Sequence, residues 1–113
     1  IGTGLVGSEM CIRDRAYRWQ VFSKASSLMH GETMGAEASY MKIFWSELDV
    51  DLHAIALELL AERGELLASA PDAIAEYDWM SGYLFSLSGP IYAGTNEIQR
   101  NIVAERVLGL PRK

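Results

Sequence analysis

A stretch of 28 residues, 36–63, contains neither Pro nor Gly and constrains the fold more than any other part of the chain. Its large apolar residues recur at intervals of three and four, which is the spacing of one face of an α-helix. These residues are Met41, Phe44, Leu48, Leu52, Ile55 and Leu59. At 1.5 Å per residue the predicted helix is about 42 Å long. Gly64 follows it as a C-cap signal. Such a helix is longer than a domain of this size needs, which indicates a helical bundle inside a larger protein.

Three further segments are predicted to be helical. Residues 16–30 carry an apolar stripe that ends before Gly31, residues 77–88 begin a helix at Asp78, and a last helix runs from about residue 95 to residue 108. Residues 64–76 are predicted to form a loop, and no segment alternates as a half-buried strand would. The sequence therefore predicts an all-α fold, a partial antiparallel helical bundle.

Composition excludes several classes of protein. The 113 residues hold 10 Lys and Arg against 15 Asp and Glu, a net charge of −5. This balance argues against nucleic acid and against an anionic membrane surface as partners. No apolar run approaches the roughly 18 residues of a spanning helix, and we expect a cytoplasmic protein. The single Cys11 permits no internal disulfide, and His30 and His53 lack metal-ligand spacing, so no metal is expected.

The first fifteen residues do not fit the rest. Residues 2–7 spell a literal GxGxxG, but no strand precedes this motif and no strand–helix–strand pattern follows, so a dinucleotide-binding reading is unsupported. The stretch LVGSEMCIRDR resembles translated read-through of a sequencing adapter. We therefore expect 1–15 to be a non-native or disordered leader and 16–113 to be the domain. A chain that begins with Ile1 is also expected to be a fragment.

The approach to the last helix is the informative part of the chain. Tyr92, Ala93, Gly94 and Thr95 lead directly into it. Gly94 lets a ligand or another backbone come close, and Thr95 is suited to cap the helix. Free N–H groups and the positive end of the helix dipole favour an anion such as phosphate. The alternative is a simple capped helix, since most caps bind nothing.

The segment IYAGTNEIQRNIVAERVLGLPR resembles the C-terminal signature of the acyl-CoA dehydrogenase family. Upstream, AYRWQVFSKASSLMHGETMGAEASYMKIFWSELDVDLHAIALELL resembles the preceding helices of the same domain. The resemblance implies a flavoprotein that uses FAD to convert an acyl-CoA to a trans-2-enoyl-CoA. It implies an electron-transfer flavoprotein or a similar acceptor as partner, and a homo-oligomer or a hetero-oligomer with a sister subunit. Only part of the C-terminal helical domain is present here.

The resemblance also implies roles for individual residues. Thr95, Asn96 and Glu97 correspond to a turn that contacts FAD near its pyrophosphate and adenosine end. Glu58 lies in a region that matches a helix end meeting the FAD of a neighbouring subunit. The family's usual glycine pair is replaced there by Ala61 and Glu62, a departure that weakens this assignment.

On the substrate side, Tyr92, Ala93 and Gly94 correspond to positions beside the acyl thioester. The backbone N–H at the Ala93 position helps to polarise the thioester carbonyl in the family, and a backbone donor survives replacement of the side chain.

Ala93 is the departure that matters most. Many family members carry a glutamate there, which removes the α-proton while the flavin takes a hydride from the β-carbon, and alanine cannot accept a proton. Glu97 and Glu105 are poor replacements. Three explanations stay open: the base lies on an earlier helix, the chain is the non-catalytic subunit of a heteromer, or the flavin chemistry differs. We favour the first slightly, and we expect these 113 residues alone to be inactive.

Overall fold

The computed structural model describes residues 3–73 and 78–112, and every regular element within them is helical. The elements are α1 (Thr3–Met29), α2 (Glu37–Leu60), a 3₁₀-helix η1 (Ala61–Glu65), α3 (Trp79–Ser86), α4 (Asn96–Ile102) and a π-helical turn η2 (Val103–Val107). The prediction of an all-α partial bundle is confirmed.

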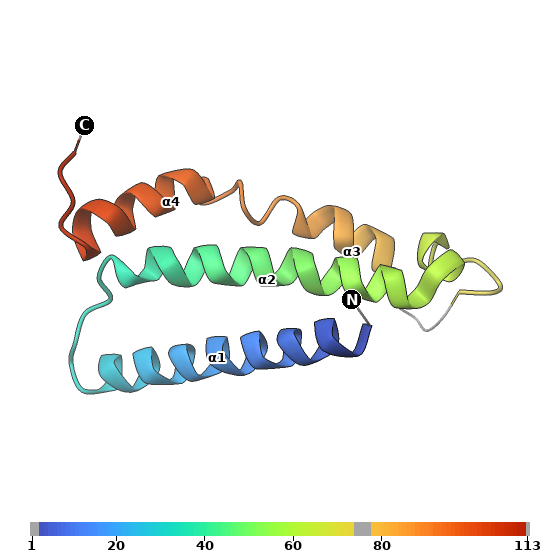
Figure 1. The fold of residues 1–113 in the computed structure, drawn as a ribbon, viewed down its shortest axis with the longest axis horizontal. Helices are drawn as coiled ribbons and strands as arrows, with labels where there is room; N and C mark the ends of the chain where they lie inside the picture. Colours follow the sequence, from blue (N-terminus) through green and yellow to red (C-terminus); the bar gives the residue numbers. More distant parts are fainter. Residues whose placement is uncertain (1–2, 74–77, 113) are drawn as a thin grey trace.

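Helix α2 is the centre of the arrangement (Figure 1). Helix α1 runs antiparallel along one side of α2, while α3 and α4 follow one another along the other side. All three contact α2, but among the described elements α1 contacts neither α3 nor α4. The described helices therefore form an open layer rather than a closed bundle.

The first helix is longer than the sequence indicates. It begins at Thr3 rather than near Ala16, so residues 3–15 continue the same helix and the expectation of a disordered leader is wrong for them. Arg13 in this part pairs with Asp51 of α2 at 2.6 Å, and Met10 is buried. Packing against α2 thus accounts for helix where local periodicity predicts none. The non-native origin of residues 1–15 stays a prediction.

The predicted stop of the long helix at Gly64 is also wrong. Helix α2 ends at Leu60, and Ala61 adopts a positive φ of 49°. Gly64 lies within η1 and is buried against α2, where an added Cβ would be 3.1 Å from the Leu57 carbonyl oxygen. Close packing, rather than a left-handed backbone, is what this glycine provides. By contrast Gly31, with φ of 86°, follows the end of α1 as predicted, and Gly109, with φ of 68°, follows the end of η2.

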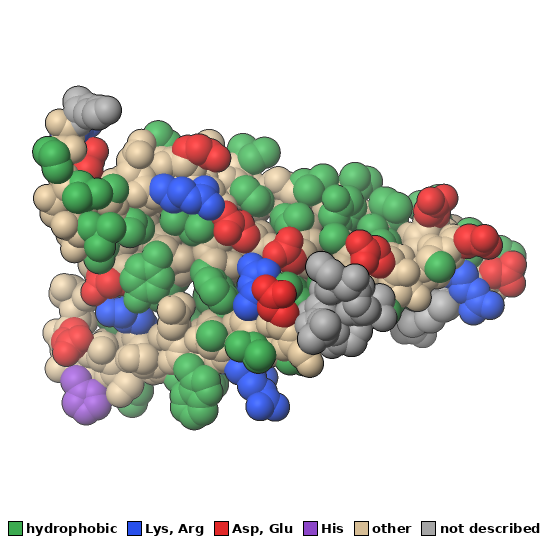
Figure 2. All heavy atoms as spheres, in the orientation of Figure 1, with side chains coloured by type: hydrophobic (Ala, Val, Ile, Leu, Met, Phe, Trp, Pro, Cys, Tyr) green, Lys and Arg blue, Asp and Glu red, His purple; other side chains and the backbone are tan. Residues whose placement is uncertain are grey.

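Few apolar side chains are enclosed by the described residues. Among residues 7–73 and 78–112, whose burial the structure describes, Met10 and Leu48 are the only buried large hydrophobic residues, whereas Met29 is 87% exposed and Trp19 and Phe85 are each 72% exposed. Figure 2 shows hydrophobic side chains at the surface along α3 and α4. Despite this apolar surface, none of the described helices has the length and hydropathy of a membrane span.

Candidate functional site

The turn that precedes α4 has an unusual backbone. Ala93 and Gly94 both have positive φ, of 55° and 87°, although alanine carries a Cβ and rarely adopts this conformation. The Asn96 backbone N–H donates a 2.9 Å hydrogen bond to the Pro90 carbonyl oxygen, which closes the turn. The turn is therefore held at its ends, and its middle is exposed to solvent.

Thr95 caps α4 as predicted. Its hydroxyl oxygen accepts a hydrogen bond from the Ile98 N–H at 3.4 Å, and its φ and ψ are non-helical. Glu97 lies exposed in the first turn. A hydrogen bond from its own N–H, and a second from the Thr95 hydroxyl, hold the pKa of the Glu97 carboxyl below its usual value. Glu97 thus carries a negative charge at the start of the helix.

The prediction of free N–H groups at this helix start is wrong. The N–H groups of Asn96, Ile98 and Gln99 donate to Pro90, to the Thr95 hydroxyl and to the Thr95 carbonyl. The donors that stay available lie one step earlier, in the turn. The N–H groups of Ala93 and Gly94 donate to no residue that the structure describes. A ligand oxygen would therefore meet the turn rather than the helix end.

Asn96 faces the interior rather than a ligand. The residue is 3% exposed, and its amide oxygen accepts from the Lys42 ammonium at 2.7 Å. Its amide nitrogen donates to the Ser46 hydroxyl at 3.0 Å and to Glu47 at 3.3 Å. These three partners all lie on α2. Asn96 is therefore an anchor that ties the start of α4 to the centre of the fold.

Gln99 is a site residue that the sequence analysis missed. Its side-chain Nε2 donates a 2.9 Å hydrogen bond to the Ala93 carbonyl oxygen. Helical side chains tilt toward the N-terminus, so a residue one turn into α4 reaches back over the preceding turn. This general rule, applied to the Gln at the fifth position after Gly94, predicts that the Gln side chain contacts the turn.

Tyr92 lies in the turn before α4, whereas Glu58 lies on α2, far from that turn. Tyr92 is 43% exposed, and its ring packs against Trp45, with ring centroids 6.1 Å apart. Glu58 is exposed near the C-terminal end of α2, about 18 Å along the helix from Ser46 at 1.5 Å per residue. The fold thus gathers Tyr92, Ala93 and Gly94 into one turn, and it leaves Glu58 remote from them.

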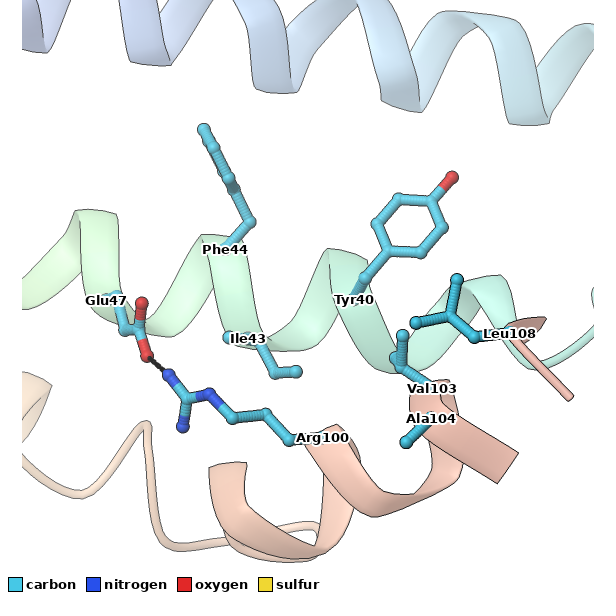
Figure 3. Close-up of a pocket in the computed structure, with 8 residues that line it drawn as sticks. All are labelled: Tyr40, Ile43, Phe44, Glu47, Arg100, Val103, Ala104 and Leu108. Atoms are coloured by element: carbon cyan, nitrogen blue, oxygen red, sulfur yellow. Dashed lines mark hydrogen bonds and ion pairs between the residues drawn. The ribbon is translucent and has the colours of Figure 1, made fainter. Parts of the chain in front are cut away.

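A separate apolar pocket of about 340 Å³ lies between α2 and the segment formed by α4 and η2 (Figure 3). An ion pair between Glu47 and Arg100 lies at one side of it. The lining residues are Tyr40, Ile43, Phe44, Glu47, Arg100, Val103, Ala104 and Leu108. None of them belongs to the Tyr92–Glu97 segment, although Glu47 links the pocket to Asn96. In residues 3–73 and 78–112 no group of His, Cys, Asp and Glu is arranged to hold a metal ion.

Curated relatives are similar in sequence to this chain over most of its length. IpdE1 of Mycobacterium tuberculosis, an acyl-CoA dehydrogenase, is 44% identical over 73 residues, which are 64% of this chain and 18% of that protein. IpdE1 of Mycolicibacterium smegmatis is 41% identical over 92 residues, which are 80% of this chain and 22% of that protein. The acyl-CoA dehydrogenase FadE26 of M. tuberculosis is 30% identical over 83% of this chain and 24% of its own length. The chain thus spans less than a quarter of these relatives.

Solved structures share the fold. The ChsE4–ChsE5 complex from M. tuberculosis matches with a TM-score of 0.85 and 27% identity, over 98% of this chain and 28% of that chain. The Tcur3481–Tcur3483 steroid ACAD matches with a TM-score of 0.89 and 21% identity, over 98% of this chain and 29% of that chain, which shows the fold alone.

The model of the acyl-CoA dehydrogenase C-terminal domain matches residues 8–108, nearly the whole chain, and the match begins inside the segment 1–15. The resemblance found in the sequence is therefore confirmed. This chain belongs to the acyl-CoA dehydrogenase family and comprises its C-terminal domain.

Proposed function

We propose that this chain is the C-terminal helical part of a cytoplasmic, FAD-dependent acyl-CoA dehydrogenase that oxidises an acyl-CoA thioester to the 2-enoyl-CoA. The observation that carries this proposal is the exposed Ala93–Gly94 turn, whose N–H groups have no partner among the described residues. Such donors, fixed in place before a ligand arrives, suit an oxygen on which negative charge develops. In the proposed reaction that oxygen is the thioester carbonyl.

The side chains beside the turn fit FAD if they contact its ribose and adenosine rather than its phosphates. Glu97 is an exposed anion, so it repels phosphate. It can accept a hydrogen bond from a ligand hydroxyl. We therefore assign Thr95 and Glu97 to the ribose and adenosine end of FAD rather than to its pyrophosphate. Asn96 would contribute through its backbone, because its side chain is buried. Glu58 would serve the FAD of a neighbouring subunit. When bound, FAD supplies the acceptor for a hydride from the β-carbon.

The chain's own contribution to the chemistry is to bind and polarise the substrate. The Ala93 N–H donates to the thioester oxygen, which makes the α-proton more acidic, and Tyr92 and Gly94 line the same turn. Ala93 has no basic atom, so a carboxylate on an earlier helix, outside this chain, takes the α-proton. An electron-transfer flavoprotein or a similar acceptor would be the partner that takes up the electrons.

A second candidate follows from the same alanine. The chain belongs instead to the non-catalytic subunit of a heteromeric dehydrogenase, with the working site in a sister subunit. The similar ChsE4–ChsE5 structure is a complex of two proteins, which supports a heteromer. Ala93 alone does not distinguish the two candidates, because both leave this position without a base.

The complete protein tests the proposal. It is purified alone and together with the product of any adjacent dehydrogenase gene, and its flavin absorbance and turnover are measured with linear and steroid acyl-CoA substrates. Flavin and turnover in the protein alone support the first candidate, and turnover only with the sister protein supports the second. A complete protein that binds neither flavin nor acyl-CoA in either form contradicts both.

The substitution Ala93→Glu further distinguishes the two candidate functions. Because Ala93 already tolerates its φ of 55°, a longer side chain is accommodated without a new backbone conformation. Turnover gained by a previously silent subunit favours the second candidate. Unchanged or reduced turnover in an active protein favours a base on an earlier helix, since two carboxylates at one site raise the pKa of one another.

A further inference from the structure

The peptide between Ala93 and Gly94 is held by one side chain. Gln99 Nε2 donates to the Ala93 carbonyl oxygen at 2.9 Å. A Cβ added to Gly94 would be 2.8 Å from the same Nε2, so the Gln99 amide lies directly over this peptide. The absence of a side chain at Gly94 is therefore what admits Gln99.

This contact also sets the direction of the free donors. In a trans peptide the C=O and N–H groups point in opposite directions, so the Gly94 N–H points away from Gln99. Only φ and ψ of Ala93 separate this peptide from the preceding one, which carries the Ala93 N–H. A carbonyl held by Gln99 limits ψ of Ala93, and thereby limits the orientation of the Ala93 N–H.

The ends of the turn do not depend on Gln99. The Asn96 N–H already closes it onto Pro90 at 2.9 Å, and the buried Asn96 side chain ties α4 to Lys42 and Ser46. Loss of the Gln99 amide therefore leaves the start of α4 in place. It frees the peptide planes in the middle of the turn, where Ala93 holds a positive φ that a residue with a Cβ leaves readily.

We propose that Gln99 is a positioning residue, which holds the Ala93–Gly94 peptide so that the Ala93 N–H meets the thioester carbonyl oxygen. The inference rests on the proposed function, because it concerns the same turn and the same substrate. Gln99 touches neither substrate nor cofactor in this role and acts through the backbone of Ala93.

The first test replaces Gln99 with Leu in the complete enzyme, together with its partner subunit where one is needed. Leu has a similar length and no donor. We expect kcat to fall roughly 10–100-fold, the size expected for a small misplacement at a reacting centre, with KM and flavin content nearly unchanged. The carbonyl stretching band of a bound, unreactive acyl-CoA analogue should move back toward its frequency in free solution. Asn101→Leu, an exposed change on the same helix, is the matched control.

The second test replaces Gln99 with Glu and follows pH. An ionised carboxylate repels the Ala93 carbonyl oxygen, whereas a protonated one donates to it as Gln does. The ratio of variant to wild-type kcat should therefore rise as the pH is lowered toward about 4.3, the ordinary pKa of Glu. The charged side chains around this turn, Glu97 and Arg100 on α4 and Lys42 and Glu47 on α2, are the same in both proteins, so the comparison isolates residue 99.

The outcomes separate the two proposals. Wild-type kcat and an unmoved carbonyl band in Gln99→Leu overturn the positioning role and leave the proposed function intact. A wild-type protein that binds no acyl-CoA analogue overturns the proposed function, and the positioning role with it. If wild type binds the analogue without turning it over, the carbonyl band alone decides. Where Gln99→Leu loses its flavin, a flat pH ratio for Gln99→Glu overturns the positioning role.

Discussion

The Lys42 ammonium on α2 donates a 2.7 Å hydrogen bond to the amide oxygen of Asn96, 54 residues away at the start of α4. The Asn96 amide nitrogen donates in turn to Ser46 and to Glu47, and Glu47 also pairs with Arg100. A buried amide with partners on both its atoms is costly to remove, because the partners lose their own hydrogen bonds. This network joins the turn of the candidate site to the central helix.

Asn96→Ala should loosen the start of α4. We expect the free energy of local opening to fall by about 1–3 kcal/mol, the cost of leaving buried polar groups unpaired. Hydrogen exchange of the peptides that cover residues 90–108, in the complete protein, measures this opening. Asn101→Ala on the same helix is exposed and should change protection by less than about 0.5 kcal/mol. Equal protection in the two variants would show that the buried network contributes nothing.

The cap of α3 predicts a dependence on pH. Hydrogen bonds from the Ser81 N–H and hydroxyl hold the pKa of Asp78 below its ordinary value of 3.8. A lowered pKa means that the stabilisation is present above the unfolded value and is lost as the pH falls through the folded one. Exchange protection at the start of α3, corrected for intrinsic rates, should therefore decrease below about pH 4.

Asp78→Asn is the control for this dependence, because asparagine caps a helix without titrating. Its protection should stay level over the same pH range, and Asp78→Ala should lower protection at every pH. A parallel decrease in wild type and in Asp78→Asn would assign the loss to another group.

Gly89→Ala should disturb the packing of the α3–α4 connection on α2. An added Cβ would be 3.0 Å from the Ser86 carbonyl oxygen and 3.3 Å from Ser46 Cβ, and backbone atoms move only at a cost. We expect a destabilisation of about 1–3 kcal/mol, as for other overpacked sites, seen as faster exchange in α3 and α4. Gly7→Ala, whose added Cβ would meet no atom within 4 Å beyond the neighbouring backbone of its own helix, should instead stabilise α1 by up to about 1 kcal/mol. Matching effects at the two glycines would contradict the structure.

The 113 residues on their own should be neither active nor well packed. Exposed apolar side chains, such as Trp19, Met29 and Phe85, favour association of the isolated chain. We expect binding of a hydrophobic dye, association on size-exclusion chromatography and no turnover with FAD, an acyl-CoA and an electron acceptor. A monomer that melts sharply, or any turnover, would contradict this expectation.

Features that depend on near neighbours in the chain were predictable. The long helix, predicted over 36–63, spans Glu37–Leu60, and the caps at Asp78 and Thr95 form as their residue types indicate. Gly31 and Gly109 take the left-handed backbone that follows a helix end. Periodicity and caps work through contacts three or four residues apart, so the sequence contains both partners of each interaction.

Features that depend on residues far apart in the sequence were not predictable. No neighbouring residue in the sequence distinguishes Asn96, whose side chain contacts α2, from an exposed cap residue. No local sequence pattern predicts that α1 begins at Thr3. Gly64 was read as a helix stop because its sequence position fits one, whereas its packing on Leu57 gives it another role. The sequence by itself determined the family, the existence of the four α-helices and the capped turn before α4. Only the tertiary structure decided which side chains hold that turn, because a hydrogen bond between residues 50 apart exists only once two helices have packed.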